Sequence, residues 1–147
     1  MEEEYREMYK AAFEEACKGL AEGGIPIGAA LVKGNKIIGV GHNQRVQKDN
    51  PILHGEMDCF QNAGRQKSYK GMTLYTTLNP CMMCSGTIVQ FKIEKVVIGE
   101  NLNFEGNTDF LRSHGVEVIL LNDEPSVLMM KKFIVENSEL WNEDISE

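Results

Sequence analysis

The sequence predicts a layered α/β domain with helices packed on both faces of a sheet. Two observations support this fold class. Segments with apolar residues at three- and four-residue spacing alternate with short β-rich runs along the 147 residues. The chain also contains no long linker, internal repeat or low-complexity block, and its length suits one domain with a sizeable core.

Four elements are expected in the first half of the chain: a helix over residues 4–21, strands over 27–33 and 36–41, and a helix over 54–63. Gly23-Gly24 followed by Pro26 ends the first helix, because neither residue type continues a helix well. Gly34-Asn35 is a turn signal. The two strands on either side of it are therefore expected to form an antiparallel hairpin.

Six elements are expected in the second half: strands over residues 72–78, 95–99 and 116–121, and helices over 82–91, 108–113 and 123–137. Pro80 suits the start of the helix that follows it. The last two strands are joined by a short helix, which favours a parallel pair. Because sites in such sheets form near strand ends, we look for one in the loops after residues 41, 78 and 99.

The charge and hydropathy of the chain limit the classes of molecule that it is expected to bind. The formal net charge is −7 and the basic residues form no stripe, which disfavours a nucleic acid and favours a small uncharged substrate. No apolar run approaches the roughly 20 residues that a membrane span needs. The acidic start, Met1-Glu2-Glu3-Glu4, has no apolar signal-peptide core, so we expect a cytoplasmic protein without a membrane partner.

The four cysteines divide into two kinds. Cys17 and Cys59 fall among apolar residues in helical patterns and are predicted to be buried small hydrophobes. Cys81 and Cys84 have the spacing of metal ligands at a helix start. Disulfides are not expected in a protein without a secretion signal.

The stretch from His54 to Cys84 predicts a catalytic zinc site. His54, Cys81 and Cys84 supply one imidazole and two thiols, which leaves the fourth position of a tetrahedral zinc ion for water. Glu56, two residues from His54, is the candidate base beside that water. A structural zinc site or a redox cysteine pair would explain Cys-x-x-Cys alone. His-x-Glu followed by Pro-Cys-x-x-Cys is the signature of zinc nucleobase deaminases.

The sequence resembles the cytidine-deaminase-like superfamily and, within it, the fungal-type cytosine deaminases. The similarity extends over nearly the whole chain. Similar stretches include 23–28, 41–43, 54–56, 73–78, 80–84, 99–101, 103–104 and 141–145. The last of these, Trp141 to Ile145, distinguishes the fungal-type group, because the zinc motif is shared by the whole superfamily.

The resemblance implies a three-layer α/β/α sandwich with a five-stranded mixed sheet, formed by residues 1–147 as a single zinc-dependent deaminase domain. It implies a homodimer with one Zn²⁺ per subunit and a place in pyrimidine salvage. The implied reaction is hydrolytic deamination of free cytosine to uracil and ammonia. In it, zinc hydroxide attacks C4, and Glu56 carries the proton from the water to ring N3 and then assists the departing ammonia.

The same resemblance implies a substrate pocket. Asn43 and the backbone N–H of Gly55 would hold the N1–C2=O2 edge of the pyrimidine, and the N–H of Cys81 would stabilise oxygen developing on C4. Asp144 would help to read the amino-group side. The ring would lie between apolar side chains that exclude water, namely Leu78, Phe104, Trp141 and Ile145.

The resemblance also implies a lid over the pocket, and the sequence departs from the family pattern at one pocket residue. Residues 138–147 would form a C-terminal lid segment, since Trp141 and Ile145 are four apart and share a helix face. Asn79 stands where the fungal pattern usually has Ser. It would contact substrate mainly through its backbone, so its effect on catalysis is expected to be modest.

The same motifs are compatible with three other functions. Another small base or nucleoside, such as guanine or cytidine, would use the same zinc motif with different pocket walls. A tRNA adenosine deaminase needs an open groove, which the acidic charge and a closing Trp141 disfavour. A non-catalytic zinc module would not need Glu56.

Overall fold

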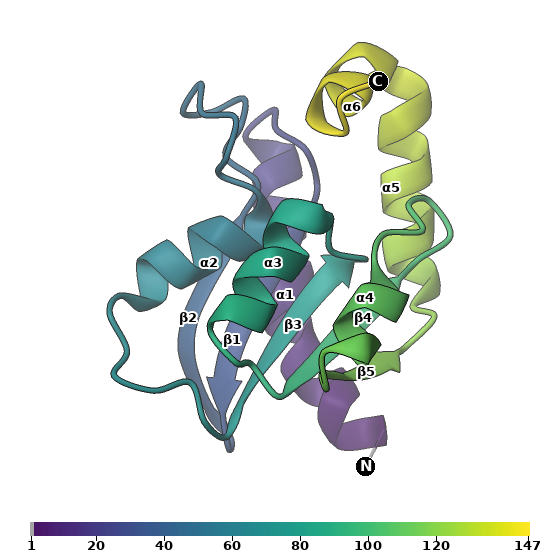
Figure 1. Cartoon of the computed structure of the whole chain (residues 1–147). Coiled ribbons are helices and arrows are strands. Elements are labelled where there is room, and N and C mark those ends of the chain that lie inside the picture. The colour runs from purple at the N-terminus through teal and green to yellow at the C-terminus, as the bar shows by residue number, and fades with distance from the viewer. Residues whose placement is uncertain (1) are drawn as a thin grey trace.

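The computed structural model describes residues 2–147 and contains a five-stranded mixed sheet between two layers of helices (Figure 1). Its elements are α1 (Glu2–Ala21), β1 (Gly28–Lys33), β2 (Lys36–His42), α2 (Gly55–Ala63), β3 (Met72–Leu78), α3 (Met82–Gln90), β4 (Lys95–Glu100), α4 (Thr108–Ser113), β5 (Glu117–Leu120), α5 (Glu124–Glu136) and α6 (Ser138–Asp144). The predicted three-layer α/β/α fold is confirmed, and the predicted elements are found within one or two residues of their expected ends.

The sheet has the strand order β2-β1-β3-β4-β5. β1 pairs antiparallel with both β2 and β3, whereas β3–β4 and β4–β5 are parallel. The predicted hairpin and the predicted parallel pair are therefore both present. In register, Leu78 at the end of β3 lies beside Glu100 at the end of β4. Both strand ends consequently meet at the edge of the sheet from which α3 and the 101–107 segment depart.

Alternation along the strands produces two cores. Leu31, Leu74 and Val96 face one side, where α2, α3 and α4 cover the sheet with residues such as Phe60 and Ile88. The adjacent strand residues Ala30, Val32, Tyr75 and Val97 face α1 on the other side. Figure 1 shows α2, α3 and α4 in front of the sheet and α1 behind it. The three central strands, β1, β3 and β4, are thus buried on both faces, whereas the edge strands β2 and β5 are partly exposed.

Helix α5 lies on the α1 side of the sheet. The hydroxyl of Tyr9 in α1 and that of Ser126 in α5 are hydrogen-bonded at 2.6 Å. After α5 the chain turns into α6, whose Trp141 packs with Ile25, Ile27 and Leu78 in a third apolar cluster. The C-terminal residues therefore lie over the carboxyl end of β3, from which the chain leads to Cys81 and Cys84.

Close approach of α2 to β2 depends on small residues in the strand. A side chain at Gly41 would collide with the backbone nitrogen of Cys59 in α2. Cys59 itself is fully buried, as predicted. The prediction for Cys17 is wrong, because Cys17 is exposed and its Sγ lies 3.9 Å from Sδ of Met129. The buried stripe of α1 follows Ala12 and Ala16, so the next residue turns away from the sheet.

Candidate metal and substrate site

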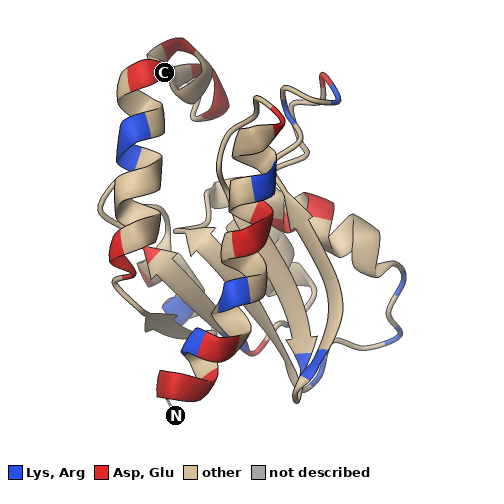
Figure 2. Cartoon of the chain, turned by 180° about the vertical axis from the view of Figure 1, so that it is seen from behind, with Lys and Arg blue, Asp and Glu red and all other residues tan. Residues whose placement is uncertain are grey.

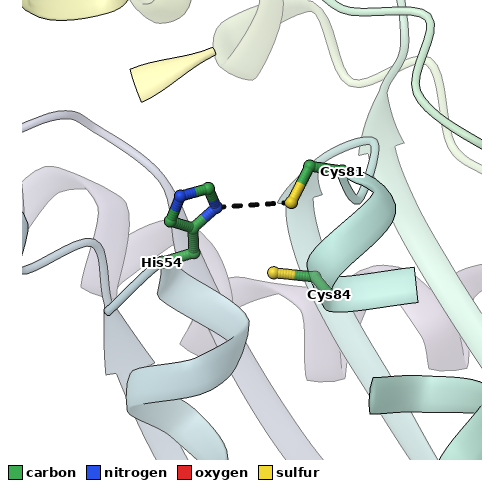
Figure 3. A group of neighbouring side chains, drawn as sticks. All are labelled: His54, Cys81 and Cys84. Carbon is green, nitrogen blue, oxygen red and sulfur yellow. Dashed lines mark hydrogen bonds between the residues drawn. The ribbon is translucent and has the colours of Figure 1, made fainter. Parts of the chain in front are cut away.

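Two helix starts bring the metal motif together. His54 immediately precedes α2 and Cys81 immediately precedes α3, and neither helix start is capped by a side chain. The candidate ligand atoms of His54, Cys81 and Cys84 all lie within 4.8 Å of one another. Figure 3 shows the imidazole and both thiols pointing to a common centre, with His54 Nδ1 3.5 Å from Cys81 Sγ. The three ligand atoms are therefore close enough to bind the same metal ion.

This donor set suits zinc. Thiolate and imidazole are preferred zinc ligands, and three of them leave one position of a tetrahedron for water or substrate. The second ring nitrogen of His54, Nε2, faces Oδ1 of Asp144 at 3.6 Å. A carboxylate in that position orients a ligating imidazole and fixes its tautomer. The chemistry of the three side chains therefore fits one zinc ion bound through Nδ1 and the two sulfurs.

The ionisation of the two thiols differs. The pKa of Cys81 is lowered to about 4 because the Cys84 thiol donates to its sulfur and the His54 imidazole lies beside it. The pKa of Cys84 is raised well above its usual value, because that thiol donates to Cys81 and is buried. Cys81 is thus a thiolate at neutral pH, whereas Cys84 keeps its proton until a bound metal ion displaces that proton.

Glu56 is the buried carboxyl next to this cluster. It is the second residue of α2 and its exposed fraction is 3%. Burial, and then the negative charge of Cys81, raise the pKa of Glu56 to about 7. A carboxyl group with this pKa is poised to take up and release a proton near neutral pH.

A cavity of about 530 Å³ opens onto the cluster. It contains nine of the expected site residues, which are His54, Glu56, Leu78, Asn79, Cys81, Phe104, Trp141, Asp144 and Ile145. Seven other residues complete its lining, namely Ile27, Arg45, Pro51, Met82, Met83, Asn107 and Ser146. The ring of Phe104 meets that of Trp141 edge-on, with centroids 6.2 Å apart. These two aromatic rings give the cavity an apolar wall opposite the metal motif.

Comparison of the whole chain with known proteins shows its family. Residues 2–100 match the family model described as the cytidine and deoxycytidylate deaminase zinc-binding region. The chain belongs to this family. A cytosine deaminase from Candida albicans is 49% identical over 141 residues, covering 94% of both chains. The chain is accordingly a deaminase, a hydrolase acting on carbon–nitrogen bonds.

Other relatives of this deaminase carry different names. A tRNA-specific adenosine deaminase from Buchnera aphidicola is 37% identical over 131 residues, covering 87% of this chain and 83% of the relative. The solved structure of a guanine deaminase from Nitrosomonas europaea has a TM-score of 0.74 at 18% identity, covering 86% and 82% of the two chains. The second likeness shows the fold alone.

Three of the expected site residues of the deaminase, namely Asn43, Gly55 and the buried Cys84, do not line the cavity. Asn43 is fully buried, and its Nδ2 donates to Oδ1 of Asp144 at 3.2 Å, so it reaches the cavity through Asp144. Gly55 is buried at the start of α2, where an added Cβ would lie 3.0 Å from the carbonyl oxygen of Ile27. The missing side chain of Gly55 thus makes room for Ile27, the residue before β1, and not only for a flat ligand.

The side chain of Asn79 points away from the cluster of ligands. Its Nδ2 donates to the carbonyl oxygen of Glu105 and to Oγ1 of Thr108, the latter at 3.1 Å. The expectation that Asn79 meets substrate through its backbone leaves this role of the side chain unaccounted for. Arg45 was also missed by sequence reasoning, because nothing in its spacing distinguishes it from an ordinary loop arginine. Its Nε donates to Glu143 at 2.9 Å at the rim of the cavity.

Proposed function

We propose that this protein catalyses the hydrolytic deamination of free cytosine to uracil and ammonia, with zinc held by His54, Cys81 and Cys84. One observation carries the proposal. The ligand cluster and the buried Glu56 open onto a cavity closed by Trp141, in a chain 49% identical to a cytosine deaminase over 94% of its length. A zinc ion bound there would supply a Lewis acid that lowers the pKa of water at its open position.

Glu56 is proposed to move the protons of the reaction. Its pKa of about 7 lets the carboxylate take a proton from the attacking water and deliver it to ring N3, while the water oxygen forms its bond to C4. The second proton of the water, relayed by the same carboxyl group, neutralises the departing amino group as ammonia. Water and cytosine thus become uracil and ammonia with no other reactant.

The remaining polar groups are proposed to orient the base. Asn43 and the N–H of Gly55 would hold the N1–C2=O2 edge, and Asp144 would accept from the amino group. The N–H of Cys81 would stabilise the oxygen that forms on C4. The apolar walls, which are Leu78, Phe104, Trp141 and Ile145 together with the backbone of Asn79, would exclude bulk water.

The charge distribution supports a small substrate over a polynucleotide. Figure 2 shows Asp and Glu interleaved with Lys and Arg along α1 and α5, and further acidic residues on α6. Helix α6 contributes Trp141 and Asp144 to the cavity lining. A polynucleotide would meet like charge there. None of the helices within residues 2–147 is long and apolar enough to cross a bilayer. A homodimer with one zinc per subunit, a cytoplasmic location and a role in pyrimidine salvage belong to this proposal.

An ammonia-release assay tests the proposal. The zinc-loaded full chain is incubated separately with cytosine, cytidine, guanine, adenine and an adenosine-containing tRNA. The proposal expects ammonia from cytosine at a rate at least about tenfold above that from any other compound. If ammonia is released from guanine or cytidine but not from cytosine, the proposed substrate is wrong. If ammonia is released from tRNA alone, the proposal of a small free base as substrate is wrong.

A further inference from the structure

The segment 101–107 carries one wall of the cavity and has no regular secondary structure of its own. It connects β4 to α4 and turns Phe104 inward against Trp141, while its neighbour Leu102 is 75% exposed. An irregular segment of this kind samples several conformations unless hydrogen bonds hold it. The position of Phe104 therefore depends on what anchors the two ends of the segment.

The first anchor is Glu100, a carboxyl group that the proposed mechanism does not use. Glu100 is the last residue of β4 and its exposed fraction is 1%. Its Oε2 accepts hydrogen bonds from the backbone N–H of Leu102 at 2.7 Å and of Asn103 at 3.0 Å. Its Oε1 accepts from Nδ2 of Asn103 at 2.8 Å. The buried carboxyl thus fixes the direction in which the chain leaves the strand.

Asn103 extends this anchor to the second helix layer. Its Nδ2 donates to Oε1 of Glu100 and also to the carbonyl oxygen of Val127 in α5, at 3.0 Å. Both acceptors need a donor, so the orientation of this amide is determined by its surroundings. Glu100 therefore holds the start of the segment against α5, the helix that leads into α6.

The second anchor is the side chain of Asn79, which holds the end of the segment through Glu105 and Thr108. Its Oδ1 also lies 3.2 Å from the Thr108 hydroxyl, so one amide satisfies both ends of a turn. Gly106 between them has φ +63°, and an added Cβ would lie 2.7 Å from Cγ of Asn79. The turn is therefore built to accept the Asn79 side chain at close range.

We propose that Glu100 and Asn79 are positioning residues that set the place of Phe104 against Trp141, and thereby the affinity of the deaminase for its base. The inference rests on the proposed function only for the identity of the base. It assigns to the side chain of Asn79 an action on the aromatic wall, in addition to the contact that its backbone is proposed to make with substrate. Loss of either anchor releases Phe104 from the wall and leaves the metal cluster intact.

The single tryptophan of the chain gives a readout that needs no substrate. Trp141 is 6% exposed and contacts Phe104, so release of Phe104 exposes the indole to water. In E100Q one carboxylate oxygen is replaced by an NH2 group, so the side chain can accept hydrogen bonds at one position only. The new NH2 group would then face the Asn103 donor. We expect a red-shifted Trp141 emission from E100Q. The matched control is Asp123→Asn, the same change at a carboxylate whose hydrogen-bond partners lie in α5; its emission should equal that of the wild type.

A double-mutant cycle separates positioning from general stability. E100Q and Asn79→Ala should each raise KM for cytosine about tenfold, with kcat changed less than about threefold. In the Phe104→Ala background, neither change should raise KM further, because the group on which they act is absent. N79A keeps the inference testable if E100Q does not fold.

The inference fails if the Trp141 emission of both variants equals that of the wild type, or if each variant raises KM by the same factor with and without Phe104. Failure of the proposed function has a different signature. The wild-type enzyme would then not deaminate cytosine, while the emission spectra of E100Q, N79A and D123N would still decide whether the anchors hold the aromatic wall.

Discussion

Nδ2 of Asn43 donates a hydrogen bond to Oδ1 of Asp144 at 3.2 Å, although 101 positions separate the two residues. The same carboxylate oxygen lies 3.6 Å from Nε2 of His54. Asp144 therefore joins the end of β2, a proposed metal ligand and the C-terminal helix. Burial raises the pKa of Asp144, while His54 and Asn43 oppose that rise. The C-terminal helix is thus connected to the reacting centre and not only packed near it.

Removing either partner of this contact should weaken catalysis. Asn43→Ala and Asp144→Ala are each expected to lower kcat/KM for cytosine about 10- to 100-fold, and the double variant should lose less than the product of the two. Steady-state kinetics on the four proteins measures the coupling. Glu143→Gln, which alters only the exposed pair with Arg45, is the control and should change kcat/KM less than about threefold. Independent, multiplicative effects of N43A and D144A would refute the coupling.

Deleting residues 138–147 should remove the lid. The truncated protein loses Trp141, Asp144 and Ile145 from the cavity lining, so kcat/KM for cytosine is expected to fall at least about 100-fold. At saturating zinc the metal content should stay at the wild-type level, because the three ligands lie upstream, whereas the loss of Asp144 beside His54 should weaken zinc affinity about 10- to 100-fold. Full activity of the truncated enzyme would show that the segment has no part in closing the cavity.

Zinc affinity should rise steeply with pH. Burial opposes protonation of His54, but the hydrogen bond to Cys81 and the charge of Asp144 outweigh it and raise its pKa to about 9. The pKa of Cys84 is also raised, whereas that of Cys81 is lowered to about 4. Zinc must therefore displace two protons between pH 6 and 8, and the apparent Kd should fall about 100-fold per pH unit.

Competition with a chelator of known affinity measures this dependence. Cys84→Ser should bind zinc far more weakly at every pH, whereas Cys17→Ser, the exposed cysteine of α1, should match the wild type. An apparent Kd that does not change between pH 6 and 8 would contradict the assigned ligand set.

Glu56 should destabilise the protein after its metal has been removed by chelation. Its folded-state pKa of about 7 exceeds the ordinary value of 4.5, so the folded state binds the proton more tightly than the unfolded state. The stability due to that proton is present below pH 4.5 and is lost as pH rises through 7. Glu56→Gln should therefore become more stable than the wild type, by about 3 kcal/mol at pH 8 and by little at pH 4.5. Urea unfolding of both proteins at the two pH values checks this, and equal differences at both would rule it out.

The sheet and the ligand cluster could be predicted because their signals are local. The β-rich composition of β3 and the helical spacing in α1 are properties of short stretches of chain, and the spacing of Cys81 and Cys84 is fixed by one helical turn. Cys17 could not be placed, since its exposure depends on which residues of α1 meet the sheet. Local spacing alone does not determine that face.

The far wall of the cavity was harder to predict for the same reason. The direction of the Asn79 side chain is determined by Gly106 and Thr108, which approach it only after α4 has packed against α3. The carboxyl of Glu100 bonds two residues that follow it in the chain, and nothing in its sequence neighbourhood separates this role from an ordinary strand end. Tertiary packing, and not periodicity, defines these positions.

Glu56→Gln tests the central claim most directly. The wild type and the variant are loaded with zinc, their metal content is measured, and the conversion of cytosine to uracil is followed by ultraviolet absorbance. The account predicts equal zinc content in both proteins and a turnover by E56Q that is lower by at least about four orders of magnitude, since an amide cannot take up the proton that the Glu56 carboxylate carries. Turnover of cytosine by zinc-loaded E56Q at the wild-type rate would contradict it.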